Sequence, residues 1–362
     1  MAPLHQDNIP IVSIQRSTYA HIDLDSLLNP LGNLQKYIKT GERVLLKTNL
    51  LTPSTPERAV VTHPAVINAV AHAILKIGGI PYIGDSPSGP FTKRRLEKIY
   101  EKAGLIDLAN KLGIELNYDT TSQKISIPYG KKLKKTVVCN FVLDAEKIIA
   151  LPKIKTHSYM IMTLATKIMY GVIPGLTKAR YHSMFIKKTT FADMLLDVLS
   201  VRVPDLVVMD GIVGMQGDGP SGGTPVNLEV LLASEHAVAM DLAVCTMLGI
   251  EPIGIPTLRQ AKLRKLWPAE IAYPLLAPTD IGYTSFLLPS SADHLITGRK
   301  KPHRFPVPTA NCTVCRQCEK ICPKHAITMT SQRAEVDYNK CIRCYCCHET
   351  CPYDAIHLEV IK

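Results

Sequence analysis

The segment CTVCRQCEKICP (312–323) recurs 29 residues later as CIRCYCCHETCP (341–352). Each copy spaces four cysteines as C-x2-C-x2-C-x3-C and ends in proline. The likeness continues past the cysteines, because CPKHAIT (322–328) matches CPYDAIH (351–357) at the same offset. The repeat therefore indicates an internal duplication built around two sets of four thiols.

Three closely spaced thiolates and a distant fourth are typical of [4Fe–4S] ligation, and in two-cluster proteins the fourth cysteine of each run serves the other cluster. The duplicated pattern does not divide into the paired C-x2-C sets of structural zinc sites. Cys346 would break the duplicated spacing as a ligand, so we interpret it as a free thiol. We predict two [4Fe–4S] clusters, the first held by Cys312, Cys315, Cys318 and Cys351 and the second by Cys341, Cys344, Cys347 and Cys322.

Residues 309–362 closely resemble the two-cluster bacterial ferredoxins. The spans AITMT (326–330), AEVDY (334–338) and AIHLEV (355–360) are predicted as short strands of a small α+β domain with a pseudo-symmetric pair of hairpins. Such a domain transfers electrons one at a time and binds no organic substrate. Any further chemistry is therefore expected in residues 1–297.

Residues 1–297 are predicted to form an α/β domain with a large mixed or parallel sheet. Short apolar runs, such as RVLLKTN (43–49) and KIIALPK (147–153), alternate with helix-like segments. This pattern is typical of a sheet that is buried on both faces. The apolar segment 158–173 is predicted as one of the helices. Residues 298–308 are basic and rich in proline, and they are predicted to be an extended linker.

Polar side chains follow the strand that ends at Pro152. Lys155 and His157 come directly after it, and Lys167 and His182 lie further along the same region. Ligands of α/β sheets bind at the carboxyl ends of strands, so these four are predicted as catalytic residues that hold an anionic or carbonyl-bearing substrate and transfer protons. The alternative is that the lysines are solvated and the histidines are satisfied structural groups.

Four further polar residues are predicted to reach the same sheet edge, and a glycine-rich segment is a separate candidate for ligand binding. Lys47, Asn49, Asp85 and Ser86 each lie at the end of a predicted strand. The segment DGIVGMQGDGPSGGTP (210–225) holds six glycines after another strand, but it matches neither a Walker loop nor a dinucleotide fingerprint. These residues, with Gly217 and Gly219, are predicted to bind an unidentified organic cofactor or anionic substrate, the alternatives being turn formation and a mobile surface loop.

Several of these motifs occur together, in order, in one known family. KTN, THPAVINAV, GDSPSG, LPKIKTH, the K-x3-G-x2-PG pattern of Lys167 to Gly175, and the glycine-rich segment resemble domain-of-unknown-function family 362 (DUF362). The resemblance covers most of residues 40–250, and a ferredoxin tail is a familiar partner of that domain. It implies an iron–sulfur protein with an α/β body, and it names no substrate.

Composition excludes several other classes of protein. The 362 residues carry a net charge of +11, but no continuous basic stripe, one Trp and six Phe, which argues against nucleic-acid binding. No apolar stretch is long enough for membrane insertion, and the first residues lack a secretory layout, so a cytoplasmic protein is expected.

We therefore predict a ferredoxin-linked oxidoreductase that exchanges electrons with a redox partner protein or a soluble carrier. One alternative is a non-catalytic electron-transfer subunit that docks on a partner oxidoreductase. Another is a non-redox enzyme whose clusters serve structure or sensing.

Overall fold

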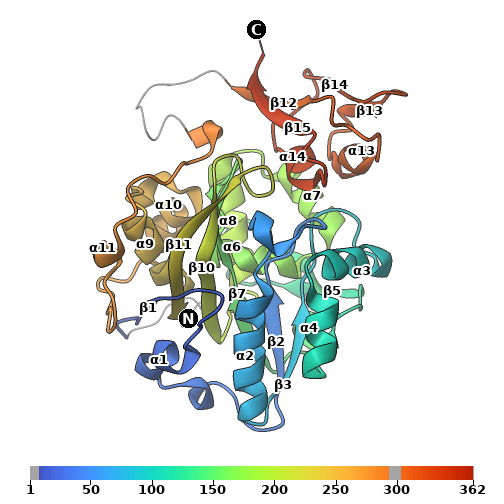
Figure 1. Ribbon diagram of the computed structural model, residues 1–362. Helices are drawn as coiled ribbons and strands as arrows, with labels where there is room; N and C mark the ends of the chain where they lie inside the picture. The colour runs from blue at the N-terminus through green and yellow to red at the C-terminus, as the bar shows by residue number, and fades with distance from the viewer. Residues whose placement is uncertain (1–7, 293–302, 362) are drawn as a thin grey trace.

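A mixed β-sheet organises the larger part of the chain (Figure 1), which the computed structural model describes over residues 8–292 and 303–361. Its strands are β1 (Ser13–Arg16), β2 (Arg43–Thr48), β3 (Ile80–Gly84), β4 (Glu115–Leu116), β7 (Lys147–Leu151), β8 (Lys153–His157), β9 (Ile161–Met162), β10 (Leu206–Gln216) and β11 (Thr224–Ser234). The order is β1-β11-β10-β7-β2-β3-β4, and β8 pairs with both β10 and β9. β10, β7, β2, β3 and β4 are parallel to their neighbours in that order, whereas β11 is antiparallel to β10 and β1. The predicted large mixed sheet is confirmed.

Helices cover both faces of this sheet. One face packs against α1 (Leu24–Leu28), α2 (Pro64–Lys76), α3 (Lys93–Lys102) and α4 (Leu105–Leu112), and the other against α6 (Leu164–Ile168), α8 (Lys188–Leu199), α9 (Ala237–Met247) and α10 (Pro256–Leu263). Successive side chains of a strand point to opposite faces, so Val44 and Leu46 join one core and Leu45 joins the other. The sheet is buried on both faces, as its apolar strands predict.

Smaller elements complete the α/β domain. They are the hairpin β5 (Ser122–Ser126) and β6 (Lys135–Cys139), and the helices α5 (Asn140–Leu143), α7 (Gly175–Met184) and α11 (Pro278–Ile281). β10 and β11 extend into the glycine-rich segment from both sides and leave a loop of residues 217–223 between them.

The prediction of a single helix over residues 158–173 is wrong in its first half. There β8 turns back through residues 158–160 into β9, and α6 begins only at Leu164. The backbone N–H groups of Tyr159 and Met160 donate to His157 Nδ1 at 3.1 and 3.3 Å, and Ile161 has a left-handed φ of 73°. These contacts fix a hairpin turn, which apolar spacing alone does not distinguish from a buried helix.

The C-terminal part forms a second, smaller unit. It consists of β12 (Arg304–Pro308), α13 (Gln317–Ile321), β13 (Ile327–Met329), β14 (Ala334–Val336), α14 (Cys346–Thr350) and β15 (Ile356–Val360). β13 pairs with β14, and β12 pairs with β15, all antiparallel. The predicted linker therefore ends earlier than expected, because residues 304–308 are a strand of this unit rather than free chain. Its residues 298–302 and the N-terminal residues 1–7 lie outside the described part of the chain.

The C-terminal unit packs on the α/β domain through α14, beside the loop 217–223 (Figure 1). Ser221 Oγ donates to the Glu349 carbonyl at 3.1 Å, and His348 Nε2 lies 2.9 Å from the Asp218 carbonyl. Arg95 of α3 also donates to Gln317 Oε1 of α13 at 3.2 Å. The glycine-rich loop thus contacts the smaller unit. Within the described residues, no helix has the length and apolar character needed to cross a membrane.

Candidate functional site

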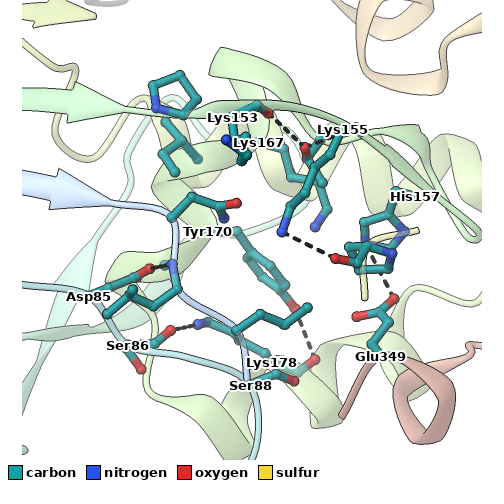
Figure 2. Close-up of a pocket in the computed structure, with 18 of the residues that line it drawn as sticks. Asp85, Ser86, Ser88, Lys153, Lys155, His157, Lys167, Tyr170, Lys178 and Glu349 are labelled. Carbon is teal, nitrogen blue, oxygen red and sulfur yellow. Dashed lines mark hydrogen bonds and ion pairs between the residues drawn. The ribbon is translucent and has the colours of Figure 1, made fainter. Parts of the chain in front are cut away.

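A cavity of about 70 Å³ lies where the sheet edge meets α14 (Figure 2). The loops that follow β2 and β3 and the segment around β8 form one side of it. α6 and α7 form another, and Cys346 and Glu349 of α14 close it. The polar and charged lining residues are Asn49, Asp85, Ser86, Ser88, Lys153, Lys155, His157, Thr163, Lys167, Tyr170, Lys178, His182 and Glu349.

The structure brings most of the predicted site residues together at this cavity. Lys155, His157, Lys167 and His182 all line it, as do Asn49, Asp85 and Ser86. Lys47 does not line it, but its Nζ lies 2.7 Å from Asp85 Oδ1. The carboxyl ends of parallel strands meet at one sheet edge, which explains why segments distant in sequence converge here.

Gly217 and Gly219 are not among the lining residues. Gly219 packs against β8, where its carbonyl accepts hydrogen bonds from Ser158 N and Oγ at 2.8 and 2.7 Å. A Cβ added at Gly219 would lie 2.5 Å from the Thr156 carbonyl oxygen. The glycine permits close packing of the loop on β8, and the following residue, Pro220, reaches the cavity.

The buried lysines of this region fall into two groups. Lys47 pairs with Asp85, and Lys153 pairs with Asp210, each at 2.7 Å. Lys155 instead donates to the carbonyls of Val60 at 2.7 Å and Pro220 at 3.4 Å, and Lys178 donates to the Ser86 carbonyl. Lys167 makes no hydrogen bond or ion pair with any of the described residues, and its Nζ lies 5.7 Å from the Tyr170 ring centre. Three ammonium groups therefore enter the pocket without a paired carboxylate.

Burial without a paired carboxylate lowers the pKa of these lysines. Burial, together with Lys167 and Lys153, lowers the pKa of Lys155 to about 7. Burial lowers the pKa of Lys178 to about 8 and also lowers that of Lys167. Desolvation disfavours the charged form of an amine, and an anion in the pocket would restore it.

His157 and Glu349 form a polar contact between the two units inside the pocket. His157 Nδ1 accepts two backbone N–H groups, so its proton is on Nε2, which lies 3.3 Å from Glu349 Oε1. Burial raises the pKa of Glu349 to about 7, although Lys167 opposes that rise. Burial and nearby cations hold the pKa of His157 well below its usual value. The pair can therefore hold a proton at the pocket wall near neutral pH.

His182 has an unsatisfied ring nitrogen. Its Nδ1 is buried and makes no hydrogen bond with the described residues, and its ring packs 4.3 Å from that of Phe191. Burial and then Lys167 lower its pKa to about 3, so the ring is neutral.

Glu349 is one lining residue that the sequence did not predict, and Lys178 is another. Glu349 lies in the spacer between Cys347 and Cys351, where ligand spacing alone guided the prediction. A signal was available, because the equivalent position of the first copy is Lys320 rather than an acidic residue. Lys320 is exposed on α13, whereas Glu349 is buried against the α/β domain.

The two predicted sets of thiols are each grouped in space. Cys322, Cys341, Cys344 and Cys347 line one small cavity together with Cys346. Burial raises the pKa of Cys318 to about 12, and the neighbouring thiols of Cys315, Cys351 and Cys312 contribute to that rise. Each group combines three cysteines of one run with the fourth of the other run. Thiolates are the ligands of iron–sulfur clusters, so the donor chemistry and the grouping fit such groups.

Cys346 lies between the second set of thiols and the larger candidate pocket, because it lines both cavities. Its thiol lies close enough to that of Cys344 to lower the pKa of the Cys344 thiol. The extra cysteine is therefore part of the wall that separates the cluster region from the pocket.

Comparison with known proteins identifies both units. The family model for "Domain of unknown function (DUF362)" matches residues 44–246, and that for "4Fe-4S binding domain" matches residues 334–357. A thylakoid-associated protein of Synechocystis sp. is 34% identical over 275 residues, which cover 74% of this chain and 82% of that protein.

Other similarities cover less of each protein. One component of an ion-translocating oxidoreductase complex from Methanosarcina acetivorans is 47% identical over 48 residues, which are 13% of this chain and 18% of that protein. One component of an NADH-quinone oxidoreductase from Pelobacter propionicus is 35% identical over 61 residues, 13% of this chain and 33% of that protein. The lactate racemase apoprotein of Thermoanaerobacterium thermosaccharolyticum aligns with 63% of this chain and 54% of its own, at 13% identity and a TM-score of 0.39, too weak a likeness for any argument.

The match over residues 44–246 and the similarity to the Synechocystis protein establish the relationship of the α/β domain. The chain belongs to the DUF362 family and carries a 4Fe–4S binding domain in its C-terminal part.

Proposed function

We propose that this iron–sulfur electron-transfer protein is a ferredoxin-linked oxidoreductase whose reaction takes place in the pocket between the two units. The observation that carries the proposal is the composition of the pocket wall. Cys346 and Glu349 come from the ferredoxin-like unit, and Lys155, His157 and Lys167 come from the α/β domain. A site built from both units suits a reaction that needs electrons from one and substrate binding by the other.

Two clusters are proposed, one for each group of four thiols. The group of Cys322, Cys341, Cys344 and Cys347 is the one beside the pocket, because Cys346 lines both cavities. When bound, the clusters would supply electrons one at a time. An external one-electron carrier or redox partner protein would supply those electrons.

The side chains of the pocket would bind the substrate and provide protons. The ammonium groups of Lys155, Lys167 and Lys178 would hold an anionic or carbonyl-bearing molecule. His157 Nε2–H and Glu349 face each other at 3.3 Å and would hold the proton that accompanies reduction of such a molecule. The closed wall over α14 limits contact with water, which strengthens charge interactions inside the pocket.

The proposal is tested with protein purified under anaerobic conditions. We expect about eight iron atoms per chain and low-temperature EPR signals after reduction. The reduced protein, freed of excess reductant, is then mixed with a panel of small oxidised anions while the cluster absorbance is followed.

We expect at least one compound to reoxidise the wild-type protein and the Lys111→Met variant, but to reoxidise Lys167→Met far more slowly. Lys111 is an exposed residue of α4 and serves as the charge-matched control. Equal reoxidation rates in all three proteins would mean that electrons do not leave the protein through this pocket. That result would favour the alternative of a non-catalytic electron-transfer subunit that docks on a partner oxidoreductase.

A further inference from the structure

We propose that the pocket binds a compact dianion through the ammonium groups of Lys155, Lys167 and Lys178. The inference rests on the proposed function for the location of the site and adds the charge and size of the ligand. Its two possible sources are a tetrahedral oxyanion, such as phosphate or sulfate, and a short dicarboxylate, such as oxalate. They share two negative charges carried on oxygen atoms over a short distance.

The charges around the pocket do not balance. Asp85 and Asp210 are each paired with a lysine that is not one of the three. The other carboxylate of the lining is Glu349, which lies 3.3 Å from the neutral His157 ring and has no lysine paired with it. Three ammonium groups therefore face one carboxylate, and a dianion would neutralise the difference. Uncompensated buried charge is costly, and a bound dianion would supply the missing counter-charge.

The lysines also have unused hydrogen-bond donors. An ammonium group has three donors. Lys155 uses two on carbonyls and Lys178 uses one, while Lys167 uses none on any of the described residues. His182 Nδ1, on a residue that is 4% exposed overall, is a further polar atom without a partner in the described part of the chain. These groups approach the cavity from β8, α6 and α7, so an anion could be held from three sides (Figure 2).

The size of the cavity restricts the ligand. A water molecule needs about 10–15 Å³ on this measure, so 70 Å³ holds about five to seven waters, or a compact anion. The charged part of the ligand is therefore small, whatever portion of a larger molecule extends from the opening.

The test measures binding without any electron transfer, so that its result is independent of the redox proposal. Cluster-loaded protein in the oxidised state is titrated by calorimetry with phosphate, sulfate, oxalate, formate and chloride at constant ionic strength. We expect one site per chain and at least about tenfold tighter binding of a dianion than of the monoanions. The difference corresponds to the free energy of one additional charged hydrogen bond.

Three variants locate the site. Lys167→Met should weaken dianion binding about 10- to 100-fold, Lys167→Arg should retain most of it, and Lys111→Met should leave it unchanged. Iron content and thermal midpoint show whether each variant is folded. Preference for phosphate and sulfate identifies an oxyanion ligand, and preference for oxalate identifies a dicarboxylate; either supports the proposal.

Equal affinity for mono- and dianions, or no saturable binding, would overturn the proposal. So would unchanged affinity in Lys167→Met. In that case the lysines would balance the negative charge of the neighbouring cluster instead. Reoxidation that still depends on Lys167 would then show that the redox proposal stands without the dianion.

Discussion

At the scale of single residues, the pocket depends on lysines that are buried without carboxylate partners. Lys153 shows the ordinary solution, since Asp210 accepts hydrogen bonds from its Nζ at 2.7 Å and from the Tyr19 hydroxyl at 3.1 Å. Lys155 and Lys167 lack such a partner among the described residues. The contrast separates a structural ion pair from groups that are available to a ligand.

Asp210→Asn is expected to destabilise the fold strongly. The carboxylate also accepts the His63 N–H at 2.9 Å, so the substitution leaves Lys153 charged and buried without its counter-ion. Breaking a buried pair in this way costs about 3–5 kcal/mol. Urea unfolding measures the change, with Asp107→Asn at an exposed position of α4 as the control. A loss below about 1 kcal/mol in Asp210→Asn would show that Lys153 finds another partner or loses its proton at little cost.

Lys167→Met is expected to stabilise the ligand-free protein while it weakens anion binding. It removes a buried charge without a paired carboxylate and keeps a side chain of similar length. Substitutions of this kind commonly add about 0.5–2 kcal/mol of stability and reduce function. The thermal midpoint in the absence and presence of sulfate separates the two effects. A lower midpoint without ligand would indicate that the Lys167 ammonium is compensated in the wild-type protein.

Anion affinity is expected to fall as pH rises through 7 to 8 and beyond. The pKa of Lys155 is lowered to about 7 and that of Lys178 to about 8, so both are charged below pH 7 and both become neutral above pH 8 in the free protein. The charged and titratable groups that face them are Lys47, Asp85, Cys139, Lys153, Lys167 and Glu349. Above pH 8, each lysine that must regain its proton lowers the affinity about tenfold per pH unit.

Calorimetry in two buffers of different ionisation enthalpy measures this proton uptake directly. We expect net uptake at pH 8 and little at pH 6. Uptake that is independent of pH would mean that these lysines keep their protons in the free protein.

At the scale of elements, α14 has two roles that the linear pattern does not separate. It carries Cys347, one of the predicted cluster ligands, and it places Glu349 over the pocket. The loop 217–223 holds it there through Ser221 and Asp218. Glycine in this loop allows the close approach, because a Cβ added at Gly222 would lie 2.7 Å from His348 Cε1 and 2.8 Å from Asp354 Oδ1.

Gly222→Ala and Gly171→Ala are expected to affect different sides of the pocket. Gly222→Ala should loosen the contact of α14, at a cost of about 1–3 kcal/mol for overpacking, and make the C-terminal unit easier to cleave with protease. Gly171→Ala should disturb the Lys47–Asp85 pair, since its Cβ would clash with both side chains, and leave protease sensitivity of the C-terminal unit unchanged. Equal protease sensitivity in both variants would show that loop packing does not hold α14.

At the scale of the whole molecule, the C-terminal unit acts as one wall of the pocket. Its hydrophobic cluster is small and includes the cysteines themselves, such as Cys318 and Cys347. Units of this size generally need metal groups or cross-links to remain folded. Cluster binding and closure of the pocket are therefore expected to be coupled.

Removal of iron by a chelator is expected to expose the buried lysines. Lys155, Lys167 and Lys178 should react with an acylating reagent at least about tenfold faster after chelation, because α14 no longer covers them and exposure controls access. Mass spectrometry of peptides measures the labelling, with exposed Lys111 as the internal control. Unchanged labelling of the three lysines would show that α14 stays in place without iron.

The features that depend on local interactions can be predicted from the amino-acid sequence. Ligand spacing groups the thiols, because a C-x2-C-x2-C run leaves little freedom in how three thiolates surround one group. The alternation of apolar strands and helices predicts a sheet that is buried on both faces. The ends of the predicted strands indicate which polar residues converge, and Lys155, His157, Asn49 and Asp85 do line one cavity. The duplicated run also predicted the ferredoxin-like unit.

Features that depend on contacts between distant segments become visible only in the folded molecule. The turn at 158–160 depends on backbone N–H groups that donate to His157, and the position of Glu349 depends on how α14 packs on the α/β domain. Local periodicity carries no information on either contact. The charge state of the pocket also cannot be predicted from the sequence, because the pKa of a lysine depends on its burial and its neighbours. Lys153 and Lys155 are both buried, but the fold places Asp210 beside Lys153 and only carbonyl groups beside Lys155.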